Sequence, residues 1–253
     1  MLYPSRPPEP HNLLFGVRPI VEALLAGKEI DKVLIKKGFD RAALQELEPL
    51  LLQHKVPYQY VPIEKLNRLT RKNHQGLVAF ASLIEYADLQ EILIAAAEAG
   101  KVPFVLLLDD VTDVRNFGAI ARSAECAGVD AIVIPSAGAA PINGDAMKTS
   151  AGALNLVPVC RVKSLYNAIT LLHQCGVQVV AASEKSATTI YEAQFELPTA
   201  LVLGSEESGI SQEVIKVADS LIKIPLVGRI ASLNVSAAAS VLLFEVQRQR
   251  NHK

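Results

Sequence analysis

Three polar loops in the second half of the chain follow apolar strands and contain side chains that could bind a ligand. In an open parallel sheet, ligands bind outside the carboxyl ends of the strands, so such loops can converge on one site. Together they favour a nucleotide-like ligand, although any one of them alone is more often an ordinary turn. Their residues are Arg115, Asn116, Gly118 and Arg122, then Gly204, Glu206, Glu207 and Gly209, then Gly228, Arg229, Ser232 and Asn234.

The same loops argue against several common chemistries. The second loop has the glycine spacing of a P-loop, but Ile210 stands where the phosphate-binding lysine belongs, and its two glutamates would repel phosphates. The first loop lacks the G-x-G-x-x-G pattern of a dinucleotide fold. No Ser–His–Asp or Cys–His set occurs in them, which disfavours covalent hydrolysis. The three cysteines and five histidines are scattered without metal-ligand spacing, so no metal site is expected.

The third loop joins a short apolar strand, predicted over Leu221 to Leu226, to a C-terminal helix. Ser232 and Asn234 stand just ahead of the helix, where side-chain oxygens can cap free backbone N–H groups. A capped core helix and a ligand loop between strand and helix both fit this pattern. The apolar residues at the spacing of one buried helix face are Val235, Ala238, Ala239, Leu242, Leu243 and Val246.

The elements around these loops indicate a mostly parallel sheet covered on both faces. The apolar strands are continuous rather than alternating, and helices separate them along the chain. They are expected within 103–111, 130–135, 177–183 and 199–204, with helices within 112–128, 164–176 and 211–219.

Residues 12–84 alternate helices and strands and predict a small α/β domain of their own. Pro49 is expected to kink or interrupt its second helix. The helices are expected within 12–27, 41–55 and 63–71, and the strands within 32–38, 57–62 and 76–83.

Length and composition limit the number of domains and the classes of protein to which the chain can belong. With 253 residues, the chain can form two domains, and it contains no apolar run of about 18 residues that would span a membrane. Residues 1–11 are proline-rich and polar, which predicts a disordered, cytoplasmic start without a signal peptide. Residues 85–101 are taken as a linker that contains a helix.

The charge distribution favours a polyanionic partner for the N-terminal domain. Residues 1–83 contain 12 basic and 8 acidic side chains, a net +4, whereas residues 84–253 contain 13 and 18, a net −5. Lys65, Arg68, Arg71 and Lys72 could form a basic rim on or beside the third helix. A solvated helix face explains the same spacing.

The three loops, in this order, resemble motifs 1, 2 and 3 of the TrmH (SpoU) ribose 2′-O-methyltransferases of the SPOUT superfamily. The N-terminal sequence FGVRPIVEALLAG resembles the substrate-binding domain of the RlmB-like subgroup, which methylates a guanosine of 23S rRNA. The motif residues are Asn116 to Gly118 and Arg122, then Leu203 to Glu206 and Gly209, then Ile224, Pro225 and Ser232 to Ser236.

The resemblance implies a SPOUT catalytic domain over residues 102–253 with a deep trefoil knot, a rare exception to unknotted topology. It further implies a homodimer that binds S-adenosylmethionine in the knot, near the backbone of Gly204, Ile224 and Leu233. RNA, most simply 23S rRNA or its precursor, would be the substrate. The alternatives are a tRNA ribose 2′-O-methyltransferase and a non-catalytic RNA-binding ribosome-assembly factor.

The resemblance also implies roles for single residues. Arg122 would take the proton of the ribose hydroxyl or fix the RNA phosphate, and Asn116 would orient Arg122 or the ribose. Glu206 would hold the motif-1 loop. Ser232 and Asn234 would position substrate and cofactor. Because a guanidinium is a poor base, binding of the phosphate is the alternative to a role of Arg122 as proton acceptor.

Overall fold

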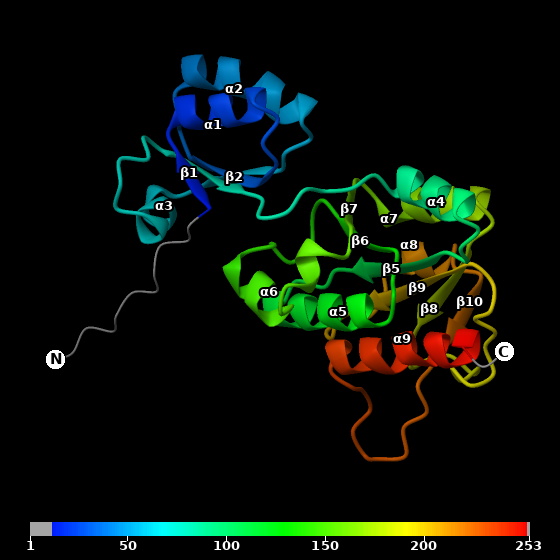
Figure 1. Cartoon of the computed structure of the whole chain (residues 1–253). Coiled ribbons are helices and arrows are strands. Elements are labelled where there is room, and N and C mark those ends of the chain that lie inside the picture. Colours follow the sequence, from blue (N-terminus) through cyan, green and yellow to red (C-terminus); the bar gives the residue numbers. More distant parts are fainter. Residues whose placement is uncertain (1–11, 252–253) are drawn as a thin grey trace. The chain divides into compact units, whose positions relative to one another are not determined.

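The computed structural model describes residues 12–251, so the predicted disorder of residues 1–11 lies outside the described residues. The chain forms two compact units (Figure 1). One unit reaches Glu85 along the chain and includes the short segment Ile142–Gly144; the other runs from Tyr86 to Pro141 and continues from Asp145.

The first unit is a four-stranded sheet with helices on both faces. The strands are ordered β1-β4-β2-β3, and only β2 and β3 pair in parallel. Helices α1 and α2 share one core with the sheet, whereas α3 packs on the other face (Figure 1). The elements are β1 (Leu13–Phe15), α1 (Val17–Leu25), β2 (Ile30–Lys36), α2 (Arg41–Gln53), β3 (Tyr58–Val61), α3 (Ile63–Leu69) and β4 (Leu77–Ala81).

The expected small α/β unit is therefore confirmed, with one local correction. Pro49 does not interrupt α2, which is continuous from Arg41 to Gln53. Proline removes one backbone donor, and Pro49 is exposed, so water can satisfy the carbonyl that loses its partner.

The second unit contains six strands in the order β10-β8-β9-β5-β6-β7, and every neighbouring pair is parallel. This confirms the parallel sheet predicted from continuous apolar strands. The strands are β5 (Phe104–Asp109), β6 (Ala131–Pro135), β7 (Val159–Val162), β8 (Gln178–Ala182), β9 (Thr199–Gly204) and β10 (Ser220–Ile222).

Helices cover both faces of this sheet, as Figure 1 shows. Helices α4, α7 and α8 lie on one face, and α5 and α9 pack together on the other. Helix α6 and a short 3₁₀ turn connect β6 to β7. The helices are α4 (Leu89–Glu98), α5 (Val114–Cys126), α6 (Gly144–Thr149), α7 (Leu165–Gln174), α8 (Gln212–Ile215) and α9 (Val235–Asn251).

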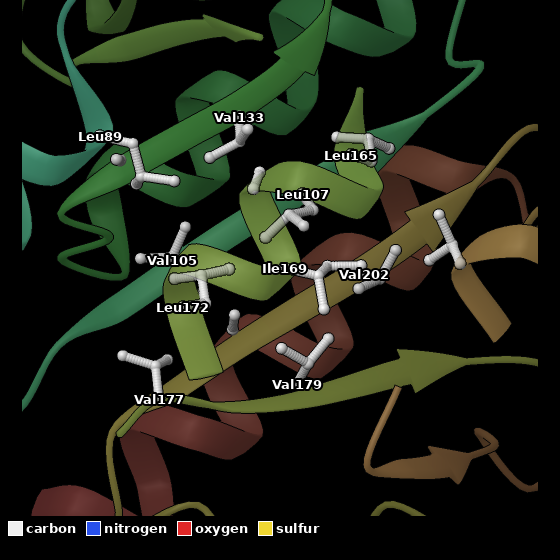
Figure 2. Packing of buried hydrophobic residues seen from close by; sticks show 14 of the residues in the cluster. Leu89, Val105, Leu107, Val133, Leu165, Ile169, Leu172, Val177, Val179 and Val202 are labelled. Atoms are coloured by element: carbon white, nitrogen blue, oxygen red, sulfur yellow. The ribbon is translucent and has the colours of Figure 1, made fainter. Parts of the chain in front are cut away.

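The core between α7 and the sheet holds these elements together. In Figure 2, Ile169 and Leu172 of α7 point onto the strands that carry Leu107, Val179 and Val202. These five side chains are almost completely buried. Burial of a side chain of this size contributes about 1.5–3 kcal/mol, so these contacts stabilise the packing of α7 against the sheet.

The helix expected within residues 85–101 is α4, whose Leu89 and Leu93 lie in the core of the second unit. One strand differs from the sequence-based expectation. Strand β10 ends at Ile222 rather than Leu226, because the backbone of Lys223 exchanges hydrogen bonds with Thr188 and Ile190.

The guanidinium of Arg250 binds the C-terminal end of α9 to neighbouring segments of the second unit. Arg250 donates to the carbonyl oxygens of Val102, Pro103, Phe195 and Leu197 at 2.8–3.1 Å. Burial lowers the pKa of Arg250. The four carbonyl oxygens therefore replace the water that would otherwise solvate the charged guanidinium of Arg250.

We expect Arg250→Ala to lower the free energy of unfolding by about 2–4 kcal/mol, because several acceptors lose a charged donor. Arg250→Lys keeps the charge but lacks the forked geometry, so it should fall between alanine and the native chain. Urea unfolding followed by circular dichroism measures both. Equal stability of the alanine variant and the native chain would contradict this role.

Glu245 of α9 makes stability depend on acid pH. Its carboxylate is buried and accepts two hydrogen bonds from Arg248 and one from Gln249. The bond from Arg248 lowers the pKa of Glu245 below the ordinary value of 4.5, against the opposing effect of burial. The unfolded chain then binds more protons in this window, so the contribution is complete above pH 4.5 and is lost as pH falls through the lowered pKa. Glu245→Gln should flatten this part of the stability–pH curve, measured by denaturation from pH 3 to 7.

Within residues 12–251, no helix is both long and apolar enough to cross a membrane. The trefoil knot implied by the motifs stays a prediction.

Candidate active site at the carboxyl edge of the sheet

One carboxylate oxygen joins the three predicted motif loops. Oε1 of Glu206 accepts hydrogen bonds from the side-chain amides of Asn116, at 3.1 Å, and Asn234. It also accepts from the backbone N–H of Val235 at 3.2 Å. The amide of Asn234 donates in turn to Oδ1 of Asn116 at 3.0 Å. Residues about 90 and 118 positions apart in sequence thus form one hydrogen-bonded cluster, the Glu206 cluster.

Helix ends hold the cluster in place. Asn234 caps α9, because its Oδ1 accepts from the backbone of Ser236 at 3.0 Å. Asp113 caps α5 and accepts from the backbone N–H of Asn116 at 2.7 Å. The Glu206 carboxylate also lies at the N-terminus of α9, where the helix dipole favours negative charge. The predicted cap at Asn234 is thereby confirmed, and the same residue also belongs to the Glu206 cluster.

The residues of the first motif lie in the helix expected within 112–128 rather than in a loop ahead of it, which corrects their placement. Arg115, Asn116, Gly118 and Arg122 all lie within α5, which begins at Val114. Gly118 has a packing role there: a Cβ at this position would stand 2.8 Å from the backbone oxygen of Ala146 in the facing segment.

A pocket of about 380 Å³ lies beside the Glu206 cluster. Its walls come from the loops after β8, β9 and β10 and from the first turns of α9. Apolar side chains form one part of the wall, and charged side chains form another. The apolar residues include Leu203, Ile222, Ile224, Leu226, Leu233, Val235 and Leu242, and the charged ones are Glu184, Lys185, Glu206, Glu207 and Lys223.

Gly204 lets two backbone segments meet at the pocket. A Cβ on this residue would lie 2.1 Å from the carbonyl carbon of Gly209, so no other residue fits without displacing backbone. Ser205 and Gly209 also exchange backbone hydrogen bonds of 3.0 and 3.2 Å. Gly209 has a φ of +67°, which favours glycine. The loop after β9 is therefore a tight, backbone-lined wall.

The structure brings together most of the predicted site residues but not all of them. Asn116, Glu206 and Asn234 form the cluster, and Gly204, Ile224, Ser232 and Leu233 line the pocket. Arg122 is exposed on α5 and does not line the pocket. No described residue makes a hydrogen bond or an ion pair with the side chain of Arg122.

Sequence reasoning missed a fourth loop, from Ala182 to Lys185. It follows β8 and contributes Ser183, Glu184 and Lys185 to the pocket. The signal was available, because these polar residues follow a strand that the apolar pattern predicts. Parallel neighbours place the carboxyl ends of β8 and β9 at the same edge.

No group of three or more His, Cys, Asp and Glu side chains within the part of the chain that the structure describes could hold a metal ion.

Family models match both units of the chain. Residues 103–244 match the SpoU rRNA methylase family, and residues 13–87 match the RNA 2′-O ribose methyltransferase substrate-binding family. The first match spans the Glu206 cluster and the pocket, and more than half of the chain.

Curated relatives are similar in sequence to this chain along nearly its whole length. The chain is 34% identical over 241 residues to YacO of Bacillus subtilis strain 168, named as a TrmH family tRNA/rRNA methyltransferase, covering 95% of this chain and 97% of YacO. A TrmH family relative from Staphylococcus aureus strain MSSA476 is 35% identical over 240 residues, with 95% and 97% covered.

Solved structures of RNA methyltransferases are similar to this chain in fold. The SpoU methyltransferase AviRb from Streptomyces viridochromogenes in complex with AdoMet is 25% identical, with a TM-score of 0.60, and the match covers 95% of this chain and 91% of AviRb. The A. aeolicus TrmH/SpoU tRNA modifying enzyme is 31% identical, with a TM-score of 0.55, over 64% and 84% of the two chains. The chain thus belongs to the SpoU (TrmH) family of RNA ribose 2′-O-methyltransferases, as its three motifs predicted.

Proposed function

We propose that the chain transfers a methyl group from S-adenosylmethionine to a ribose 2′-hydroxyl of RNA, beside the Glu206 cluster. The observation that carries this proposal is the single carboxylate oxygen that joins the three motifs next to the pocket. Such fixed geometry suits a reaction whose rate depends on alignment, and alignment can contribute about 7–11 kcal/mol in favourable cases.

The pocket fits the cofactor. Its apolar wall suits a planar adenine, and the tight backbone between Gly204 and Gly209 offers N–H and C=O groups without side-chain obstruction. The sulfonium of bound S-adenosylmethionine supplies an electrophilic methyl group and leaves as a neutral thioether. AviRb, a relative of the same fold, is solved with this cofactor. In our proposal the backbone of Gly204, Ile224 and Leu233 binds it.

The protein must align the ribose hydroxyl and remove its proton. Asn116 and Asn234 are fixed through Glu206, so their amides can orient the ribose. Ser232 at the pocket wall offers a hydroxyl to substrate or cofactor. A guanidinium remains protonated in proteins and has no acceptor, so we assign Arg122 to bidentate binding of the RNA phosphate.

Arg122 would act in the active site of a partner subunit, because it is absent from the Glu206 cluster of its own chain. Exposed apolar side chains support a homodimer: Phe244 on α9 is 51% exposed, and Ile230 in the third-motif loop is 79% exposed. A second copy of the chain would remove such groups from water. Val227 and Val241 are exposed apolar side chains as well.

We propose that the substrate is a guanosine of 23S rRNA or its precursor, which would place the enzyme in the cytoplasm. The substrate-binding family match at residues 13–87 supports recognition by the first unit. A tRNA substrate is the second candidate, because the relatives carry the joint name tRNA/rRNA methyltransferase.

Methyl transfer from labelled S-adenosylmethionine to unmodified rRNA and tRNA tests the proposal directly. A methylated 2′-hydroxyl makes the adjoining phosphodiester resist alkali, so label should survive alkaline digestion as dinucleotides. Alkali-resistant label in rRNA supports the proposed substrate, and label in tRNA alone supports the second candidate. Alkali-labile label would contradict ribose methylation.

The basic rim of the first unit gives a prediction about RNA affinity. Lys65, Arg68, Arg71 and Lys72 are all exposed. We expect Arg68→Ala with Arg71→Ala to weaken RNA binding and to reduce the slope of log affinity against log salt by about 1–2, since each cation releases counterions. Filter binding at several salt concentrations measures this, with Lys101→Ala with Lys216→Ala as the charge-matched control. An unchanged slope would assign the rim to ordinary solvation.

A further inference from the structure

A second pocket, of about 440 Å³, opens at the same edge of the parallel sheet. Its walls come from the segments after β5, β6 and β7 and from α8, so it lies on the α7 side of the sheet. Ser208 and Gly209 line both this pocket and the first one. The loop after β9 is therefore a shared wall, and none of the three motifs accounts for the rest of the second pocket.

The lining combines an aromatic surface with free carboxylates. Tyr166 is 43% exposed at the start of α7, and Pro135 and Leu165 add apolar wall. Asp110 and Glu213 are exposed there, and within residues 12–251 neither side chain has a hydrogen-bond partner. The third carboxylate, from Asp109, already accepts the backbone N–H of Ser211 at 2.7 Å.

Asp110 is held in an unusual conformation. Its φ is +56°, a region that costs a residue with a side chain of the order of 1 kcal/mol or more. Gly138 packs against it so closely that a Cβ there would stand 2.9 Å from Oδ1 of Asp110. Asp110 therefore lines the pocket with its side chain packed closely against Gly138.

The charges select the class of ligand. Asp109, Asp110 and Glu213 outnumber Lys163, the one cation among the lining residues, so phosphate inside the pocket is disfavoured. A flat ring that stacks on Tyr166 and donates hydrogen bonds to a carboxylate is favoured instead. Guanine meets both conditions, because its adjacent N1–H and N2–H groups can bind one carboxylate with two hydrogen bonds. Uracil offers a single ring N–H.

We propose that this pocket binds a guanine base of the RNA strand whose ribose is methylated, stacked on Tyr166 and read by Asp110. This inference rests on the proposed function, since it makes the loop after β9 the wall between the methyl donor and a substrate base. Lys163 at the rim would meet the phosphate of the same nucleotide.

Binding of free nucleosides to the full-length protein tests the site without methyl transfer. Saturation-transfer NMR should detect guanosine, with 1-methylguanosine and uridine binding about 10-fold more weakly because the paired donors are blocked or absent. Tyr166→Ala should weaken guanosine by about 5- to 100-fold, the usual range for a lost stacking partner. Tyr191→Ala removes a tyrosine of 63% exposure outside the pocket and should leave binding unchanged.

Asp110→Asn should abolish the preference for guanosine over 1-methylguanosine, and it should fold, because asparagine tolerates positive φ well. Glu196→Gln, another exposed carboxylate, is its control. Equal binding of the three nucleosides by the native protein, or an unchanged preference in Asp110→Asn, would overturn the inference.

The two proposals fail separately. If RNA is methylated but Tyr166→Ala alters neither guanosine binding nor the KM for RNA, the guanine site is wrong and the methyltransferase stands. If guanosine binds through Tyr166 and Asp110 while no RNA accepts ribose methylation, the pocket stands and the proposed reaction fails.

Discussion

Replacing Glu206 by alanine is expected to lower kcat/KM for RNA methylation by about 10²–10³-fold while the parallel sheet stays folded. One oxygen of this carboxylate accepts from Asn116, Asn234 and Val235, so its loss frees all three motifs at once. The residue acts through its neighbours, and we describe it as a positioning residue. Methyl transfer under single-turnover conditions measures the effect on the chemical step.

Glu206→Gln separates geometry from charge. Glutamine keeps one carbonyl oxygen for the three donors, so partial rescue relative to alanine would show that the cluster works by position. Glu196→Ala, which removes a carboxylate from an exposed loop, is the matched control and should retain full activity. Normal turnover by Glu206→Ala would remove the cluster from the mechanism.

Arg122→Ala is expected to reduce methyl transfer to background while the fold and the affinity for S-adenosylmethionine stay unchanged. The side chain is exposed on α5 and does not line the cofactor pocket, so its removal costs little stability. Loss of a bidentate phosphate contact should affect only the RNA-bound state. Calorimetric titration with the cofactor and the methylation assay measure the two properties side by side.

Mixed dimers locate the site in which Arg122 acts. Arg122→Ala and Glu206→Ala homodimers should both be inactive. If Arg122 serves the partner's active site, each heterodimer keeps one site with both native residues, and random exchange of equal amounts restores about a quarter of the native activity. If Arg122 serves its own chain, no site is intact, and the mixture stays inactive. The second result would contradict the shared active site.

Local sequence patterns predicted most elements because their signals are local. Continuous apolar strands indicated the parallel sheet, and the helical spacing after Asn234 indicated α9, whose Val235, Leu242 and Val246 are buried. Where the expectation failed, tertiary contacts decided the outcome. Pairing of Lys223 with the segment 188–190 ends β10 early, and β7 pairs with β6 although its short sequence gives little signal. Gly118 reads as a loop residue in sequence but allows the segment at Ala146 to approach α5.

The site divides in the same way. The sequence by itself determined the family, the three motifs and the residue types available for chemistry, because these depend on residue identity and order. Only the tertiary structure decided that Asn116, Glu206 and Asn234 share one oxygen, that Arg122 stands apart, and that the loop after β8 joins the pocket. The physical reason is that parallel strands bring loops from distant parts of the chain to one edge, and side-chain hydrogen bonds there form only once the core has fixed the strands in register.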